Sequence, residues 1–151
     1  MPTDRTDQRK QAITEYIRTD PFAEFLGVEV EIPAPGQSRA SLTVSSSMAN
    51  FHGLTHGGLI FSLSDIAFAA ASNSSGQTAV ALNVAINYLQ PSRPGDRLVA
   101  EAREVHAQGP TAVYDIRVTQ ERSGEVIARS QNLVYRRKEW FLPPDRGSEE
   151  S

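Results

Sequence analysis

The stretch HGGLIFSLSDIAFAAASN, from His56 to Asn73, decides the fold of this chain. Its apolar residues occupy every side of a helix rather than one stripe, and a helix with that pattern is buried on most sides. The small polar residues that follow, together with Gly76, are suited to ending the helix. We therefore predict one long buried helix near the middle of the chain.

Downstream of this helix the period of the sequence changes from helical to alternating. Short turns rich in Pro, Gly and Asp divide the segment into four expected strands: 78–88, 97–106, 111–119 and 125–135. The first of these strands is expected to carry large apolar residues on one face and small or amide residues on the other. Its apolar face would present Val80, Leu82, Val84, Ile86 and Tyr88.

Upstream of the helix, two alternating runs at 28–32 and 39–44 flank a Pro/Gly turn and are expected to form a hairpin. Before the hairpin, Asp20 can cap a helical turn that begins at Pro21 and is closed by Gly27. Still earlier, apolar residues at helical spacing predict a short amphipathic helix within a polar segment. These residues are Ile13, Tyr16 and Ile17.

Together these elements predict an α+β domain in which one long helix lies on a mainly antiparallel sheet of six strands. One helix covers only one face of a sheet, and a meander of strands leaves an open edge. A second copy of the chain is therefore expected to cover what is left. We divide the chain into an N-terminal polar segment with a short helix (1–20), the domain (21–136) and a C-terminal tail that we expect to be flexible (137–151).

The composition excludes several classes of function. The chain has 151 residues, a formal net charge of −3 and no long basic block, which argues against a nucleic-acid partner. It contains no cysteine, so thiolate metal sites and cysteine nucleophiles are excluded, and the glycine-containing loop with His52 and His56 is a poor metal site. We find no secretory signal and no apolar run long enough to span a bilayer, so a cytoplasmic location without membrane association is expected.

Asp65 is the anomaly of the buried helix. Phe61 and Phe68 are its neighbours one turn away, and no Lys or Arg occurs within residues 54–89 to pair with it. An ionised carboxylate among apolar side chains is costly unless it is paired. Either Asp65 faces solvent or hydrogen-bonds to a small neighbour such as Ser62, or it is a general base or nucleophile in an apolar cleft.

The loop before the helix supplies a second feature that could carry chemistry. Gly57 and Gly58 permit close approach of a ligand to backbone N–H groups at the positive end of the helix, where a developing oxyanion would be stabilised. The alternative is a loop whose backbone simply needs glycine. Eight residues along a helix separate Gly57 from Asp65 by about 12 Å. Because a base must lie within about 3 Å of its proton, either one of the two is not catalytic or the site combines two chains.

The segment HGGLIFSLSDIAFA, from His56 to Ala69, resembles the signature of hotdog-fold acyl-CoA thioesterases of the phenylacetate-degradation type. Asn50, the segment NYLQP at 87–91 and the turn PGD at 94–96 match the same pattern, and the resemblance covers roughly residues 21–136. It implies a long central helix wrapped by an antiparallel sheet. It also implies a homodimer in which two sheets join edge to edge, and pairing of dimers into homotetramers.

The resemblance implies a role for each of four residues. Asp65 would activate water or attack the thioester, and the backbone N–H of Gly57 would polarise the thioester carbonyl. His56 would hold the loop or the carbonyl, and Asn50, contributed by the partner subunit, would position water or the acyl end. The substrate implied is an acyl-CoA with a small acyl group, for example phenylacetyl or hydroxyphenylacetyl, and no cofactor is needed besides the coenzyme A thioester itself.

Substrate contacts are expected around these four residues. Relatives carry a hydroxyl or an acid on the strand after the helix, whereas this chain offers amides on a face that otherwise has alanines, so the auxiliary polar residue and the acyl preference stay open. The candidate contacts are Gly58, Phe61 and Phe68 on the helix, Asn83 and Asn87 on the strand, and Arg93 for the coenzyme A phosphates.

Two other functions stay open beside the thioesterase. A hotdog hydratase or dehydratase would use a different acid/base pair, usually with a histidine on the helix, where this chain has Asp65. A non-catalytic acyl-CoA-binding regulatory module would gain nothing from an unpaired carboxylate in an apolar groove. Release of free coenzyme A, formation of a hydrated product, or neither would distinguish the three.

Overall fold

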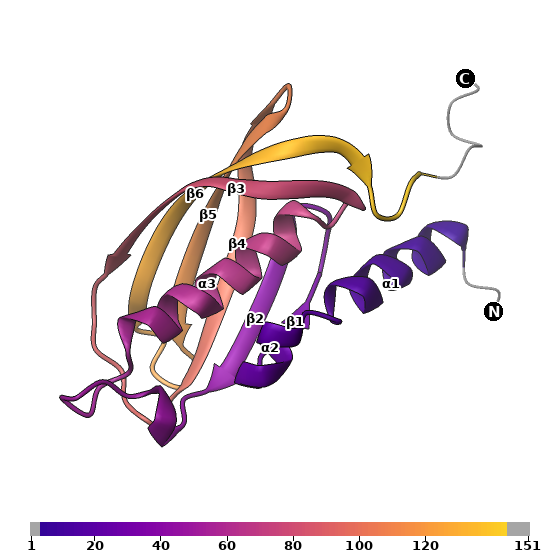
Figure 1. Cartoon of the computed structure of the whole chain (residues 1–151). Helices are drawn as coiled ribbons and strands as arrows, with labels where there is room; N and C mark the ends of the chain where they lie inside the picture. The colour runs from indigo at the N-terminus through magenta and orange to yellow at the C-terminus, as the bar shows by residue number, and fades with distance from the viewer. Residues whose placement is uncertain (1–3, 145–151) are drawn as a thin grey trace.

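The structure, a computed structural model, describes residues 4–144. Three α-helices and a short 3-10 turn are present: α1 (Arg5–Ile17), α2 (Pro21–Leu26), η1 (Ser46–Met48) and α3 (Gly57–Ser72). Six strands complete the described chain: β1 (Glu29–Glu31), β2 (Gln37–Thr43), β3 (Gln77–Tyr88), β4 (Arg97–Gln108), β5 (Thr111–Gln120) and β6 (Val126–Trp140). Figure 1 shows α3 lying along one face of the sheet that these strands form.

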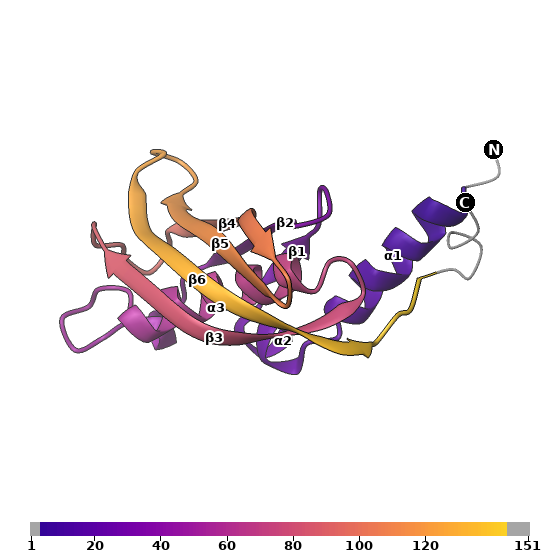
Figure 2. The same ribbon diagram turned by 90° about the horizontal axis from the view of Figure 1, so that it is seen from above.

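The six strands form one antiparallel sheet in the order β1-β2-β4-β5-β6-β3. Figure 2 shows this sheet curving around α3, while α1 projects from one end beside the end of β6. The α+β prediction, with a long helix against a six-stranded antiparallel sheet, is therefore confirmed.

Helix α3 is buried on several sides, as its composition predicts. Its side chains fill the core between helix and sheet, and the ring of Phe68 meets that of Tyr114 on β5 edge to face at 5.6 Å. The stripe of α3 that faces away from the sheet is only partly covered, and it carries Phe61, Asp65 and Ala69. The helix thus presents its one carboxylate on the side opposite the core.

The predicted helix start at Asp20 is confirmed in detail. The Asp20 carboxylate accepts hydrogen bonds from the backbone N–H groups of Phe22 (3.0 Å) and Ala23 (3.2 Å), so it satisfies two donors that the helix itself cannot. Gly27 ends α2 with a φ of 75°, a conformation that glycine adopts without strain. This local geometry fixes the position of the Asp20 side chain.

The expected alternation of β3 is wrong in its first half. The pairing of β3 with β6 shifts between Ala81 and Asn83, and one extra residue at such a bulge reverses which side chains face the core. Ala79 and Ile86 consequently pack against the same core, although their numbers differ in parity. Leu82 is instead 56% exposed.

We expected the chain from residue 137 onward to be flexible, but the structure places residues 137–144 in a strand and in a hydrogen-bonded segment after it. β6 continues to Trp140, which pairs with Gln77. Beyond the strand, the N–H of Phe141 donates to the carbonyl of Gly76 (3.0 Å), and the guanidinium of Arg9 donates to the carbonyl of Leu142 (2.7 Å). These long-range bonds hold the segment against α1 and the end of α3. The rest of the expected tail, residues 145–151, lies outside the described residues, as do residues 1–3.

The sheet ends in two unlike edges. β1 has three residues, whereas β3 has twelve and carries exposed apolar side chains, among them Leu82 and Tyr88. A long apolar edge strand is a surface on which a further strand can pair.

Candidate active site

The loop before α3 is fastened to the body of the domain at its last residues. The hydroxyl of Ser92 donates to that of Thr55 (2.7 Å), and both side chains are buried. The N–H of Thr55 donates to the carbonyl of Ser92 (2.8 Å), and the N–H of His56 donates to the carbonyl of Met48 (2.8 Å). The first turn of α3 therefore starts from a fixed position.

His56 caps this helix with its side chain. Its Nδ1 accepts the backbone N–H of Gly58 at 2.9 Å. A neutral imidazole that accepts at Nδ1 carries its proton on Nε2, so the outward nitrogen is a hydrogen-bond donor. A Cβ on Gly58 would lie 3.1 Å from that Nδ1, so glycine leaves the room that the ring needs.

Gly57 presents the free donor of the first turn. The N–H of Gly58 is taken by His56, and the N–H groups of Leu59 and Ile60 point to the His56 carbonyl (3.0 and 3.3 Å). Within residues 4–144 the N–H of Gly57 has no hydrogen-bond partner. One of the two glycine donors expected from the sequence is thus available to a ligand, at the positive end of a 16-residue helix.

Asn50 holds the loop through the oxygen of its side-chain amide. Its Oδ1 accepts from the N–H groups of His52 (2.9 Å) and Leu54 (3.1 Å). Its Nδ2 makes no hydrogen bond in the described part of the chain. Asn50 therefore holds the loop through its oxygen and keeps a donor for another molecule.

Asp65 is half-buried and unpaired. No hydrogen bond or ion pair joins its carboxylate to another of the described residues, and the hydroxyl of Ser62 donates to the carbonyl of Gly58 (2.8 Å) instead. Desolvation by burial, and secondly repulsion from the Asp20 carboxylate, raise the pKa of Asp65 above its ordinary value of 3.8. A carboxylate with a raised pKa is a stronger base when it is ionised.

Gly57 and Asp65 lie on the same helix, as the sequence predicts. Gly57 is the first residue of α3 and Asp65 follows eight positions later, so about 12 Å of helix rise separates them. One chain therefore does not bring its own free N–H and its own carboxylate to one carbonyl group.

The expected substrate contacts fall into two groups. Phe61, which is 38% exposed, lies one turn before Asp65 on the outward side of α3, and Gly58 is exposed in the first turn of the same helix. The others are not brought to that side. Phe68 is 2% exposed within the core, Asn83 and Asn87 pair with Leu133 and Arg129 on the sheet face turned away from α3, and Arg93 is exposed in the loop before β4.

Metal ligands do not gather at this site. Among residues 4–144 we find no group of three or more His, Asp or Glu side chains placed to hold a metal ion. In the same part of the chain, no helix is both long and apolar enough to cross a membrane.

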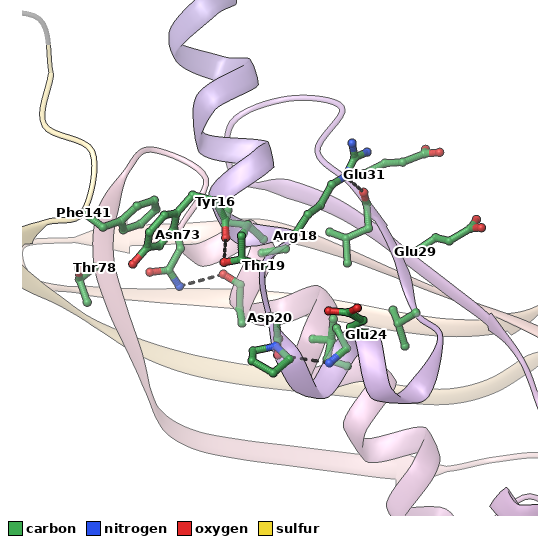
Figure 3. A pocket seen from close by; sticks show the side chains of 18 residues that line it. Tyr16, Arg18, Thr19, Asp20, Glu24, Glu29, Glu31, Asn73, Thr78 and Phe141 are labelled. Carbon is green, nitrogen blue, oxygen red and sulfur yellow. Dashed lines mark hydrogen bonds between the residues drawn. The ribbon is translucent and has the colours of Figure 1, made fainter.

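A cavity of about 740 Å³ lies beside the C-terminal half of α3, where no site was predicted from the sequence. Helices α1 and α2, strand β1 and the residue Phe141 form its walls, and Asp20 is among its lining residues (Figure 3). Sequence reasoning treated the N-terminal segment and the tail as separate from the domain. Tyr16 and Ile17, both of which line the cavity, lie at helical spacing, and this apolar face of α1 was the signal in the sequence that could have indicated packing against the domain.

Comparison with known proteins gives consistent matches. The profile of the thioesterase superfamily matches residues 52–127. The acyl-coenzyme A thioesterase PaaI of Escherichia coli is 39% identical over 107 residues, which cover 71% of this chain and 76% of that protein.

Solved structures agree with the sequence comparisons. The E. coli PaaI protein from the phenylacetic acid degradation operon superposes with a TM-score of 0.83 at 31% identity, over 88% of this chain and 96% of that one. A Streptococcus mutans protein, solved bound to acetyl CoA, superposes with a TM-score of 0.69 at 30% identity, over 73% of this chain and 88% of that one.

Proposed function

Since the chain belongs to the thioesterase superfamily and is an acyl-CoA thioesterase of the hotdog fold, we propose that its active site is shared between two subunits. The observation that supports this proposal is the separation of the two reactive groups. The free N–H of Gly57 and the unpaired carboxylate of Asp65 lie about 12 Å apart on one rigid helix. Antiparallel pairing of two β3 edges would bring the helix start of one subunit toward Asp65 of the other.

In the proposed reaction, the thioester carbonyl oxygen accepts a hydrogen bond from the N–H of Gly57. Asp65 of the other subunit removes a proton from water, whose oxygen forms a bond to the carbonyl carbon. The negative charge that develops on the carbonyl oxygen is stabilised at the helix start. The carbon–sulfur bond then breaks, and the proton held by Asp65 neutralises the leaving thiolate. Direct attack by the carboxylate, followed by hydrolysis of the anhydride, is the alternative role of Asp65.

The neighbouring groups support this arrangement. We propose that His56 donates from Nε2 to the substrate or to the loop that holds it, and that the free Nδ2 of Asn50 positions water or the acyl end. Gly58 allows the His56 ring to lie against the helix, and Phe61 borders the carboxylate on the outward side. Contacts of substrate with Phe68, Asn83, Asn87 and Arg93 stay predictions.

The substrate that we propose is an acyl-CoA with a compact acyl group, with phenylacetyl and hydroxyphenylacetyl as the first candidates. The likeness to PaaI supports this choice. A homodimer, its pairing into a tetramer, a cytoplasmic location and the absence of any cofactor beyond the thioester belong to the same proposal.

Mixed subunits test the shared site. Asp65→Asn and Gly57→Pro should each inactivate the protein alone. When the two variants are unfolded together and reassembled, half of the dimers combine them, and each such dimer has one intact site. Thiol release should then recover to about a quarter of the wild-type rate. Recovery to that level supports the shared site, whereas a mixture as inactive as its components places the whole site in one chain.

A further inference from the structure

We propose that the cavity between α1, α2, β1 and the C-terminal half of α3 receives the acyl group of the substrate, and that this group is uncharged and predominantly apolar. The inference rests on the proposed function, because it extends the same site. It assigns a role to the N-terminal helices and to the end of β6, which the proposed reaction leaves without one.

The cavity begins one helical turn beyond the carboxylate. Ala69 lies four residues after Asp65 on the same outward side of α3, and Ala69 and Ile66 both line the cavity. Asp20, at the other wall, lies near enough to Asp65 to influence its charge. A thioester carbonyl held beside Asp65 would therefore direct its acyl group along α3 into this space.

The interior of the cavity suits an apolar group. Seven of its lining residues are aliphatic: Ile17, Ala23, Val28, Val30, Ile66, Ala69 and Ala70. Two of the polar side chains among the lining, those of Asn73 and Asp20, make hydrogen bonds within the protein. Asn73 accepts the N–H of Ala79 (2.9 Å) and donates to the carbonyl of Ala69 (2.8 Å), and Asp20 accepts the two N–H groups at the start of α2. The Asn73 amide and one oxygen of the Asp20 carboxylate are therefore already bonded within the protein.

The charge around the cavity disfavours anions. Four lining residues carry a carboxylate, namely Asp20, Glu24, Glu29 and Glu31, and one, Arg18, carries a guanidinium. Figure 3 shows the carboxylates of Glu29 and Glu31 pointing away from the cavity, and Glu29 is paired with Arg97 at 3.3 Å. Two carboxylates, those of Asp20 and Glu24, are therefore set against the one guanidinium of Arg18. A dicarboxylic acyl group such as succinyl would meet repulsion there, and so would the coenzyme A phosphates. The acyl end of the substrate, rather than its nucleotide end, fits this space.

Two aromatic rings line the far end of the cavity. Tyr16 of α1 and Phe141 after β6 stack with centroids 4.7 Å apart and planes 15° from parallel. Arg9 and the backbone of Gly76 hold the segment after β6 in place. The cavity volume of about 740 Å³ lies within the range of about 300–1,000 Å³ that small-molecule sites occupy. The stacked pair therefore limits how far an acyl group can extend.

Side-chain volume in the cavity can be changed without touching the reacting groups. Ala69→Leu narrows the cavity, Tyr16→Ala opens its far end, and Ala107→Leu adds the same volume at an exposed position on β4 as a matched control. The measured quantity is kcat/KM for acetyl-, hexanoyl-, octanoyl-, phenylacetyl- and succinyl-CoA. In the wild type, kcat/KM should be lower for succinyl-CoA than for hexanoyl-CoA, whose uncharged acyl group is of similar size.

Ala69→Leu should lower kcat/KM for the octanoyl and phenylacetyl thioesters by about tenfold or more while acetyl-CoA changes little, since one or two methylenes of pocket space are worth that much. Tyr16→Ala should favour longer chains, and Ala107→Leu should reproduce the wild-type profile. An unchanged acyl profile in both cavity variants, with activity intact, would overturn the inference. Absence of hydrolysis of every thioester by the wild type would instead overturn the proposed function.

Binding to an inactive protein gives a second readout. In the Asp65→Asn background, octanoyl-CoA should bind more tightly than free coenzyme A by calorimetry, and Ala69→Leu should remove that difference. Equal affinity for octanoyl-CoA and coenzyme A in the Asp65→Asn protein, with the cavity unmodified, contradicts an acyl site in this cavity.

Discussion

The start and the middle of α3 prepare two reactive groups in opposite ways. At the start, the side chains of His56 and Asn50 and a backbone carbonyl accept from neighbouring backbone N–H groups, and in the first turn of α3 the N–H of Gly57 is left without a partner among the described residues. In the middle, Asp65 has no partner among the described residues, and burial makes its charge costly. The Gly57 N–H is held in place by the hydrogen bonds of its neighbours, whereas the Asp65 carboxylate has no hydrogen bond or ion pair to hold it. The two should therefore respond differently to substitution.

The largest effect is expected in the middle of the helix. Asp65→Asn removes the base or nucleophile with little change of shape, so kcat should fall by about 10²–10⁴-fold. Measurement of coenzyme A release with a thiol reagent gives the rate, and size-exclusion chromatography should show unchanged assembly. Full activity of this variant would remove Asp65 from the mechanism.

The same substitution should increase stability at neutral pH. The pKa of Asp65 is raised in the folded protein above the 3.8 of an ordinary aspartate, so between these values the folded state binds more protons than the unfolded one. Stability contributed by this group is thus lost as pH rises through that interval. Asp65→Asn should have the higher Tm at neutral pH, and the difference should vanish well below pH 3.8. A lower Tm than wild type at neutral pH would contradict the burial cost.

A smaller loss is expected at the helix start. Gly57→Pro deletes the free N–H, and proline is tolerated at the first helical position. His56 has φ −63° and ψ 134°, which suits a residue before proline. The rate should fall by about 10²–10³-fold. Gly57→Ala is the matched control, since it keeps the N–H and its Cβ would meet the Tyr88 ring at an ordinary 3.6 Å. Equal losses in both variants would point to crowding rather than to the lost donor.

Asn50→Asp separates the two halves of the amide. The oxygen that accepts from His52 and Leu54 is kept, whereas the free Nδ2 donor is replaced by an acceptor. We expect a fall of about tenfold in kcat/KM with an unchanged Tm, since one hydrogen bond to substrate or water is lost. Steady-state kinetics and thermal unfolding check both parts. An unchanged rate would assign Asn50 to the loop alone.

The smallest effect on activity is expected from Asp20, whose charge acts on the Asp65 carboxylate. Asp20→Asn removes a negative charge near Asp65 and keeps a good helix cap. The pKa of Asp65 should fall, and the acidic limb of the kcat/KM profile should move to lower pH by a fraction of a unit. Glu15→Gln on the exposed surface of α1 serves as a control that should leave the profile in place. A shift to higher pH, or none, would remove Asp20 from the electrostatics of the site.

Much of this site could be predicted from local sequence. Caps, turns and the buried helix depend on residues a few positions apart, and Asp20, Gly27 and α3 were predicted within a residue or two. The isolation of Asp65 was also visible, because no Lys or Arg occurs within residues 54–89. The use of the Gly58 N–H by His56 was not predicted, because it depends on the rotamer of one ring.

Other features depend on contacts between distant parts of the chain. The bulge in β3 changes which residues face the core, and only pairing with β6 reveals where the extra residue falls. The cavity wall joins Tyr16 to Phe141, and Arg9 bonds to a carbonyl 133 residues away. The hydrophobic period of a segment depends on residues a few positions apart, so it does not predict such pairs.

The sequence by itself determined a buried helix with an unpaired carboxylate, a glycine-rich helix start and enough alternating strands for one sheet, because each follows from hydrophobic period and local hydrogen bonding. The tertiary structure decided which of the helix-start donors is free, which face of β3 meets the core, and that α1 and the end of β6 close a cavity beside α3. These outcomes required packing, since each sets residues far apart in the chain against one another.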